Sequence, residues 1–457
     1  MKRGTLSHVA AMLIGLICLF TSSSCALITY SPYGNQPKTQ PTTPTRADLS
    51  VDEKQKSDGM FVGLAISGGG SRSAIFATSV MLELKKQGIL RHVDVISSVS
   101  GGSLPAAYYA LEGYNGIRFD ESDALKRMRL DFQTRWLARW FLPHNIIRYW
   151  FSDLTRSDIM VQVFDSNLFD DATFGNLNPE RPKLLINSTD SGRFDRFTFS
   201  NQSFDQLHSE LSTYSIARAV NVSSAFPGAF HRIPLKNFSP NPTPSETKYR
   251  HLYDGGPTDN LGVSTLLQVL LEEVCGAKHT TPQYSQQALR KKLVEKTESS
   301  CENQTNPIPV KKLFPQGCLI ISLDATPRED DEDGDRAHGR SVTDYFIDSN
   351  FLNATDVMLL GIRREVLENV GLSRARQDKV RFSKFSFDGG QSHCHFWHVA
   401  LRHYDGDNRA ARIGTNFGLE NWEEELLTRA GATMVQQGLD MNDIPEIISD
   451  MMKSSAP

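Results

Sequence analysis

The residues with the clearest chemical potential form a turn near the start of the chain. Ser100 lies between small residues, with Ser98 two positions before it and Gly102 two positions after it. A serine nucleophile at the end of a strand needs a sharp, strained turn, and small flanking residues let strand and helix approach each other. The pattern is G-x-S-x-G with Ser98 in place of the first glycine, so Ser100 is a candidate nucleophile. Ordinary strand-to-helix turns are also rich in serine and glycine, so this motif alone is a weak signal.

A nucleophilic serine also needs a base and a site for the oxyanion that develops during acyl transfer. Asp254 precedes two glycines at the end of a predicted strand, where it could deliver a carboxylate to Ser100. The run Gly68, Gly69 and Gly70 follows another strand and opens a helix, so its backbone N–H groups suit an oxyanion.

Two short apolar runs lead into these turns. Residues 61–66 precede the glycine run, and residues 93–96 precede Ser100. Apolar residues at helical spacing follow each turn, which is typical of a buried parallel strand that feeds a crossover helix. A βαβα unit with both turns at one edge of a sheet is therefore expected. Further strands are predicted at residues 183–190, 194–199, 248–253, 318–323 and 394–404.

Three motifs together resemble those of the patatin-like phospholipases and, more loosely, the catalytic core of cytosolic phospholipase A2. They are residues 68–72, 98–102 and 254–256, and the block 217–227 is similar to the family's segment before the aspartate strand. One such motif is weak, whereas three in family order are specific. The resemblance covers residues 60–263. It implies a three-layer α/β fold with a mostly parallel central sheet flanked by helices, plus a helical, aromatic-rich cap.

The resemblance also implies a Ser/Asp dyad without a catalytic histidine. Ser100 would attack an ester carbonyl and Asp254 would take and return the proton. Arg72 would approach a lipid phosphate or support the glycine loop. His251, three residues before Asp254, would face away from it in a strand. The implied substrate is a phospholipid, lysophospholipid or other acyl ester at a membrane surface; the alternative is a lipid-binding or envelope-scaffold protein with this fold and little turnover.

The segment at residues 118–176 is rich in aromatic and basic residues and is expected to form the cap. Phe132, Trp136 and Trp140 are spaced four residues apart, which places them on one face of a helix. Such a segment suits a lid or interfacial patch that lies among lipid headgroups. It equally suits a helical cap whose aromatic side chains pack inside the protein.

The N-terminus has the features of an export signal. Lys2 and Arg3 precede an apolar run at residues 9–20, which is too short to span a bilayer but suits a secretory signal. Cys25 follows small residues and resembles the lipidated cysteine of bacterial lipoproteins. We expect a signal segment at residues 1–25 and an outer-membrane lipoprotein that faces the periplasm or the cell surface. Without lipidation, the protein would be periplasmic or secreted.

Composition divides the remainder of the chain into a linker and a catalytic domain. Residues 26–58 are rich in Pro, Thr, Gln and Lys and are expected to form a flexible linker. The catalytic domain is expected at residues 59–450, with a polar insertion at 277–314.

Four cysteines of the expected domain would lie in an oxidising compartment after export. Cys275 and Cys301 flank a polar stretch rich in Gln, Lys and Ser, so a disulfide between them that closes this part of the insertion is one interpretation. The other is that these two, together with Cys318 and Cys394, are unpaired buried thiols.

The sequence offers little for other classes of function. A net charge of −4 provides no basic footprint for nucleic acid. His393 and His395 resemble part of a metal cluster, but strand alternation turns His398 the other way, so structural roles are expected. The acidic run at residues 329–335 resembles a calcium loop but lacks the final glutamate. We expect no metal and no cofactor, and the sequence points to no particular protein partner.

Overall fold

The structure is a computed structural model. It describes residues 33–39, 44–56, 58–241, 247–275, 308–327, 349–372, 381–386, 394–441 and 444–453. The expected signal segment with Cys25, the acidic run at 329–335 and His393 lie outside these ranges. Most of the polar insertion lies outside them too, together with Cys301.

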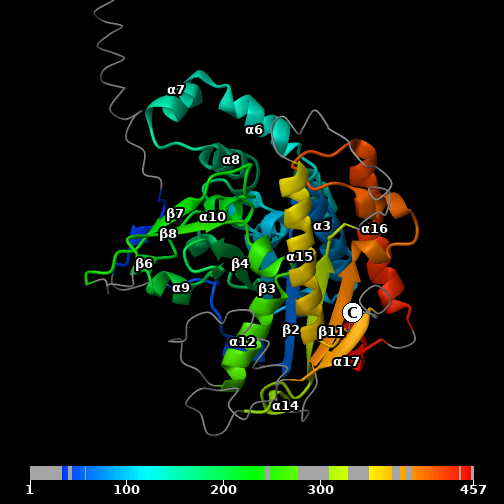
Figure 1. The fold of residues 1–457 in the computed structure, drawn as a ribbon. Coiled ribbons are helices and arrows are strands. Elements are labelled where there is room, and N and C mark those ends of the chain that lie inside the picture. Colours follow the sequence, from blue (N-terminus) through cyan, green and yellow to red (C-terminus); the bar gives the residue numbers. More distant parts are fainter. Residues whose placement is uncertain are drawn as a thin grey trace, which may run out of the picture.

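A nine-stranded sheet forms the centre of the molecule (Figure 1). Its order is β10-β11-β9-β2-β3-β4-β8-β7, and β5 also pairs with β4. Strands β11, β9, β2, β3 and β4 run parallel, whereas β10, β5, β8 and β7 join through antiparallel pairs. The strands are β2 (Met60–Ile66), β3 (Val95–Val99), β4 (Lys183–Asp190), β5 (Asp195–Phe199), β7 (Ile233–Lys236), β8 (Tyr249–Tyr253), β9 (Gly317–Asp324), β10 (Phe382–Phe385) and β11 (Cys394–Ala400).

Helices cover both faces of the sheet, because alternate side chains of each strand point to opposite faces. In β2, Val62, Leu64 and Ile66 belong to one apolar core, whereas Phe61 and Ala65 belong to the other. Helices α3, α4, α10 and α16 pack on the first face, and α12, α14 and α15 on the second. The predicted three-layer α/β fold is therefore confirmed.

The helices of the two layers range from one turn to about six. They are α3 (Gly70–Lys86), α4 (Ser103–Ala110), α10 (Ile216–Ser223), α12 (Val263–Cys275), α14 (Val310–Leu313), α15 (Ser349–Asn369) and α16 (Asn421–Leu439). Smaller elements are α2 (Glu53–Lys56), α5 (Lys126–Met128), α9 (Asn201–Asp205), α11 (Gly256–Asp259) and α17 (Glu446–Lys453). Within the described ranges, no helix is both long and apolar enough to cross a membrane.

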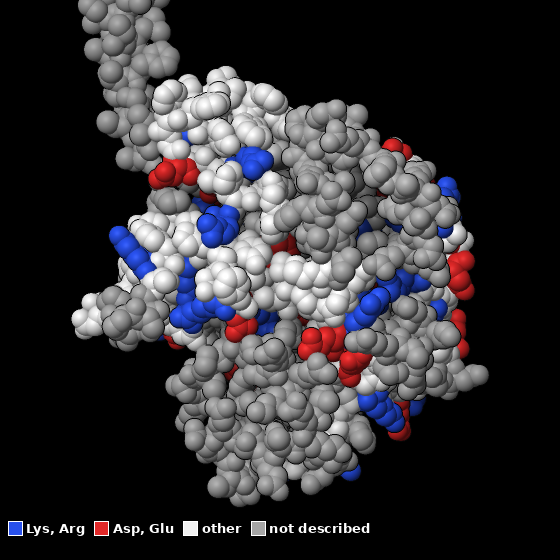
Figure 2. All heavy atoms as spheres, viewed as in Figure 1, with Lys and Arg blue, Asp and Glu red and all other residues white. Residues whose placement is uncertain are grey.

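Three helices form the cap expected at residues 118–176 and lie at the top of the view in Figure 1. They are α6 (Phe132–Trp140), α7 (Pro143–Phe151) and α8 (Arg156–Phe164). Figure 2 shows mostly uncharged atoms over this end of the molecule.

The two interpretations of the cap apply to different side chains. Phe132 is buried and Trp136 is half-buried, as expected for an inward-packed cap. By contrast, Phe141 is 72% exposed and Trp150 is 75% exposed. The cap therefore has an aromatic inner face and a separate apolar outer face.

Residues 44–56 pack against the body, in contrast to the flexible linker predicted for residues 26–58. Ala47, Leu49 and Val51 are buried in this segment. Their spacing of two matches an extended chain that turns one side to the protein. We call residues 44–56 the strap.

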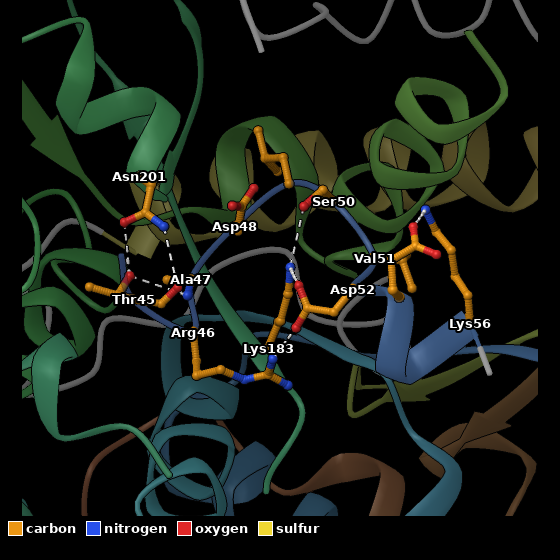
Figure 3. A network of polar contacts seen from close by, with 12 residues as sticks. Thr45, Arg46, Ala47, Asp48, Ser50, Val51, Asp52, Lys56, Lys183 and Asn201 are labelled. Carbon is orange, nitrogen blue, oxygen red and sulfur yellow. Dashed lines mark hydrogen bonds and ion pairs between the residues drawn. The ribbon is translucent and has the colours of Figure 1, made fainter. Parts of the chain in front are cut away.

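Ion pairs and hydrogen bonds hold the strap near the amino-terminal end of β4 (Figure 3). Lys183, the first residue of β4, pairs with Asp52 at 2.7 Å. Glu273 of α12 accepts the Val51 N–H at 2.6 Å and pairs with Lys56 Nζ at 2.8 Å. These contacts join the strap to elements more than 120 residues further along the chain, since Asp52 and Lys183 are 131 positions apart.

The first described residues are also bound to the body. Strand β1 (Gln36–Pro37) pairs with β6 (Ser209–Glu210). The Tyr33 ring packs against Phe238 and Tyr249, with ring centroids 6.4 Å and 6.0 Å apart. The body therefore includes residues as early as Tyr33.

A disulfide joins Cys318 of β9 to Cys394 of β11. The two strands are parallel neighbours, and the Cα atoms of the cysteines are 4.6 Å apart. The interpretation of four unpaired thiols is therefore wrong. A bridge between Cys275 and Cys301 stays a prediction, because Cys301 lies outside the described residues.

Candidate active site

The two small-residue turns meet at the carboxyl ends of β2 and β3. A Cβ atom added to Gly101 would lie 2.1 Å from the carbonyl oxygen of Gly70. One added to Gly102 would lie 2.5 Å from the carbonyl oxygen of Ser67. Only glycine allows the backbones to approach this closely. The parallel pairing of β2 with β3 thus brings both turns to one edge of the sheet, as predicted.

Ser100 follows β3 directly and has strained backbone geometry. Its φ angle is 50°, in the left-handed region that residues other than glycine rarely occupy. Its backbone N–H donates to Ser223 Oγ at 2.8 Å, and Ser223 Oγ donates to the carbonyl oxygen of Asn187 at 2.6 Å. These two hydrogen bonds hold the strained turn against α10 and β4.

Asp254 follows β8 and lies next to Ser100. The Ser100 hydroxyl donates to Asp254 Oδ2 at 3.0 Å, and the Gly256 N–H donates to Oδ1 at 2.8 Å. Burial raises the pKa of the Asp254 carboxyl to about 6, although both hydrogen bonds lower it. A carboxylate with a raised pKa within hydrogen-bond reach of a serine is suited to act as a general base.

The three glycines of the first turn differ in what their N–H groups bind. The Gly68 N–H donates to the carbonyl oxygen of Asn260 at 3.0 Å. The prediction that Gly68 contributes to an oxyanion site therefore does not hold. The N–H groups of Gly69 and Gly70 have no acceptor among the described residues and lie at the N-terminus of α3, where a negative charge is stabilised.

Arg72 lies beneath this glycine loop and is only 2% exposed. Its Nε donates to the carbonyl oxygen of Ala325 at 2.8 Å, and its Nη1 donates to that of Ile413 at 2.6 Å. The Ser71 N–H donates to the carbonyl oxygen of Asn416 at 2.8 Å. Of the two roles predicted for Arg72, these contacts favour support of the loop over contact with a lipid phosphate.

A second buried carboxylate, Asp324, lies at the end of β9. Its Oδ2 accepts Arg363 Nε at 2.7 Å and lies 3.0 Å from His398 Nε2. Burial opposes ionisation, but Arg363 and His398 outweigh it and hold the pKa of Asp324 well below its usual range. The group is therefore a buried ion pair.

This ion pair borders the glycine loop through the two residues that follow it. Asp324 Oδ1 accepts the Thr326 N–H at 2.9 Å. The Ala325 N–H donates to Ser67 Oγ at 2.8 Å, and the Ala325 carbonyl oxygen accepts Arg72 Nε. Residues 324–326 thus position both ends of the loop that contains Gly69 and Gly70.

Neither His398 nor His251 joins the dyad. His398 is fully buried against Asp324, in a structural role as predicted. His251 is exposed on β8 and makes no hydrogen bond with Asp254.

Sequence reasoning did not single out Ser223, Asn187 or the pair of Asp324 and Arg363. Asn187 donates to Ser97 Oγ at 2.9 Å and accepts from Thr265 Oγ1 at 2.7 Å, so it joins β3, β4 and α12 beneath the site. In the sequence, Asn187 could have been found as a polar residue inside an apolar run. Asp324 could have been found in the same way as Asp254, as an acidic residue directly after a predicted buried strand.

Residues 64–267 match the family model of the patatin-like phospholipases. The matched part includes the glycine loop, Ser100 and Asp254. No curated protein sequence matches the chain.

Solved structures with a similar fold include human GIVD cytosolic phospholipase A2, at a TM-score of 0.50 and 13% identity, over 88% of this chain. The match spans 61% of the human chain. VipD from Legionella pneumophila matches at a TM-score of 0.34 and 12% identity, over 91% of this chain and 72% of that chain. At such identity the similarity to the human enzyme shows the fold alone.

Proposed function

We propose that this chain, which carries a patatin-like phospholipase domain in residues 64–267, is a serine acylhydrolase that cleaves acyl esters of phospholipids or lysophospholipids. The observation that carries the proposal is the 3.0 Å hydrogen bond from the Ser100 hydroxyl to Asp254. It joins a strained serine to a buried carboxylate whose pKa is raised to about 6.

In the first half of the reaction, Ser100 Oγ attacks the ester carbonyl carbon and Asp254 takes the hydroxyl proton. The N–H groups of Gly69 and Gly70 stabilise the oxyanion. When the tetrahedral intermediate collapses, the bond to the leaving oxygen breaks and Asp254 returns the proton to that oxygen. The products are a lyso-lipid or glycerol derivative and an acyl ester on Ser100.

In the second half, water attacks the acyl ester and Asp254 takes a proton from the water. Collapse of this intermediate releases a free fatty acid, and the proton returns to Ser100 Oγ. The serine and carboxylate recover their initial protonation states, so the cycle needs no cofactor for proton balance.

A fluorophosphonate probe tests the nucleophile. We expect labelling of the wild type and loss of labelling in Ser100→Ala. Ser71→Ala is the matched control, because Ser71 lies in the neighbouring glycine loop and its Oγ has no hydrogen-bond partner among the described residues. An unlabelled wild type, or equal labelling of Ser100→Ala, contradicts the assignment and favours a lipid-binding protein with little turnover.

We also propose that the protein is exported and is anchored through a lipid on Cys25. Lys2, Arg3 and the apolar run at residues 9–20 support export. The Cys318–Cys394 disulfide supports it independently, because disulfides persist in oxidising compartments.

Mass spectrometry of the mature protein tests the anchor. We expect a diacylglyceryl-modified Cys25 in the membrane fraction, and no such modification in Cys25→Ser. A mature wild-type chain that begins elsewhere and carries no lipid contradicts the anchor, and a chain that retains residues 1–25 in the cytoplasm contradicts export.

A further inference from the structure

The outer face of α6 and α7 is the largest concentration of exposed apolar side chains in the described part of the chain. Seven of the ten exposed large apolar side chains found there lie between residues 137 and 151. They are Leu137, Phe141, Leu142, Ile146, Ile147, Trp150 and Phe151. We call these seven residues the outer face.

The inner face of the same helices makes hydrogen bonds within the protein. The Trp136 indole donates to the carbonyl oxygen of Arg156 at 3.0 Å. Asn145, fully buried, donates to the Arg139 carbonyl oxygen at 2.9 Å, and Arg139 donates to that of Gln162 at 3.1 Å. The helices therefore use polar and aromatic contacts to attach to α8, and they turn their remaining apolar side chains to solvent.

The charge of this segment favours an anionic occupant. From Phe132 to Ser152 the sequence holds three arginines and one histidine and no acidic residue, although the chain as a whole has a net charge of −4. A helix that combines exposed Trp, Phe and Leu with basic residues is typical of segments that lie in the interface of an anionic bilayer.

The inner face also connects α6 to both loops that border the dyad. The Gln133 N–H donates to the Phe417 carbonyl oxygen at 3.1 Å, and the residue before Phe417 accepts from the glycine loop. The Trp136 ring lies 5.7 Å from that of Phe230, which lies 6.0 Å from that of Phe417. Phe230 follows α10, whose end binds Ser100. Helix α6, which joins α7, is therefore in contact with the loops around the site.

We propose that the outer face binds the surface of an anionic lipid bilayer and positions the dyad to take its acyl ester from that bilayer. This inference rests on the proposed acylhydrolase function, since it names the surface through which that site meets its substrate. The apolar side chains enter the interface, and the net positive charge of the segment favours anionic headgroups.

A second copy of this chain is a poorer occupant. Two copies that met through this face would bring together two α6–α7 segments that each carry a net positive charge and no carboxylate. Like charges in an interface oppose association.

Binding to vesicles tests the proposal separately from catalysis. All proteins carry Cys25→Ser, so that no attached lipid contributes, and Ser100→Ala, so that the lipid stays intact. We expect binding to phosphatidylglycerol vesicles, weaker binding to phosphatidylcholine vesicles, and at least a tenfold loss of binding in Phe141→Ala/Trp150→Ala/Phe151→Ala. The control is Trp422→Ala, which removes an exposed tryptophan from α16 and should bind like the parent.

Hydrolysis by proteins that keep Ser100 completes the test. The ratio of vesicle hydrolysis to hydrolysis of p-nitrophenyl butyrate, a monomeric ester, should fall at least tenfold in the triple variant and stay constant in Trp422→Ala. Unchanged vesicle binding in the triple variant overturns the docking surface, as does a concentration-dependent dimer that the triple variant abolishes. Loss of fluorophosphonate labelling in the parent would instead overturn the proposed function, whatever the vesicles show.

Discussion

Two aspartates at the same edge of the sheet are both buried, yet their pKa values shift in opposite directions. Asp254, directly after β8, is 5% exposed, and Asp324, the last residue of β9, is fully buried. The pKa of Asp254 is raised to about 6, whereas that of Asp324 is held well below its usual range. The hydrogen-bond partners explain the opposite pKa shifts. Asp254 accepts hydrogen bonds from a neutral hydroxyl and a neutral amide, whereas Asp324 accepts one from a charged guanidinium.

The comparison shows that one sheet edge provides both a catalytic base, Asp254, and a structural carboxylate, Asp324. Asp254 is desolvated by burial, and no cation among the described residues offsets the effect, so its pKa is raised. It can therefore accept a proton near neutral pH, which general-base catalysis requires. A paired Asp324 stays ionised and instead fixes the backbone beside the glycine loop. Burial alone therefore does not identify a catalytic carboxylate; the charge of its neighbours must be considered as well.

Asp254→Asn should have the largest effect. We expect kcat to fall by about 10³-fold or more, because the amide cannot take the serine proton. The melting temperature at pH 8 should not fall, since the variant removes a buried charge. Steady-state hydrolysis and thermal unfolding measure both effects. Retained turnover in the folded variant would refute the role of Asp254 as base.

Asp324→Asn should chiefly affect stability. Loss of the carboxylate leaves the Arg363 guanidinium buried and unpaired, which costs about 3–5 kcal/mol in the free energy of unfolding. Urea denaturation measures this loss. The double variant Asp324→Leu/Arg363→Met should recover most of it, because it removes both charges. A single variant as stable as the wild type would show that the ion pair contributes little.

The pH dependence should separate the two aspartates. Below pH 6, kcat/KM should fall about tenfold per pH unit as Asp254 is protonated, and it should be constant above pH 7. The raised pKa of Asp254 favours folding below its unfolded value, and this contribution is lost as the pH rises through about 6. The lowered pKa of Asp324 acts in the opposite sense: its contribution is present above the unfolded value and is lost as the pH falls through the folded one. An activity profile that stays flat from pH 5 to 8 would argue against Asp254 as the titrating base.

Ser98→Ala should have the smallest effect. Ser98 is fully buried on β3, and its Oγ has no hydrogen-bond partner among the described residues. Removal of an unsatisfied buried hydroxyl is nearly neutral or slightly stabilising, within about 1 kcal/mol. Thermal unfolding and kcat should both stay close to wild type. A large loss of activity would show that the hydroxyl has a role in the turn.

The sequence predicted the parts of the fold that local patterns determine. Apolar runs located β2, β3 and β9, and helical spacing after the two turns located α3 and α4. The G-x-S-x-G-like turn and the acidic turn before α11 are also local patterns, so Ser100 and Asp254 were found from the sequence.

Tertiary contacts explain what the sequence did not predict. The hydrogen bond from the Gly68 N–H to the Asn260 carbonyl oxygen depends on where the residue after α11 lies relative to the glycine loop, which no local pattern predicts. The Cys318–Cys394 disulfide depends on β9 and β11 being neighbours. The strap had a weak signal, the alternation of Ala47, Leu49 and Val51, which its polar composition concealed.

If Cys25 carries the proposed lipid, the attachment of Tyr33 to the body limits how far the protein can lie from the membrane. Tyr33 and Cys25 are eight positions apart in the sequence. A fully extended chain spans about 3.5 Å per residue, so Cys25 can lie at most about 28 Å from Tyr33. This reach is close to the thickness of a bilayer's hydrocarbon core, about 30 Å. A catalytic domain tethered this closely would reach only the lipids near its anchor. Further substrate molecules would have to arrive by lateral diffusion in the membrane.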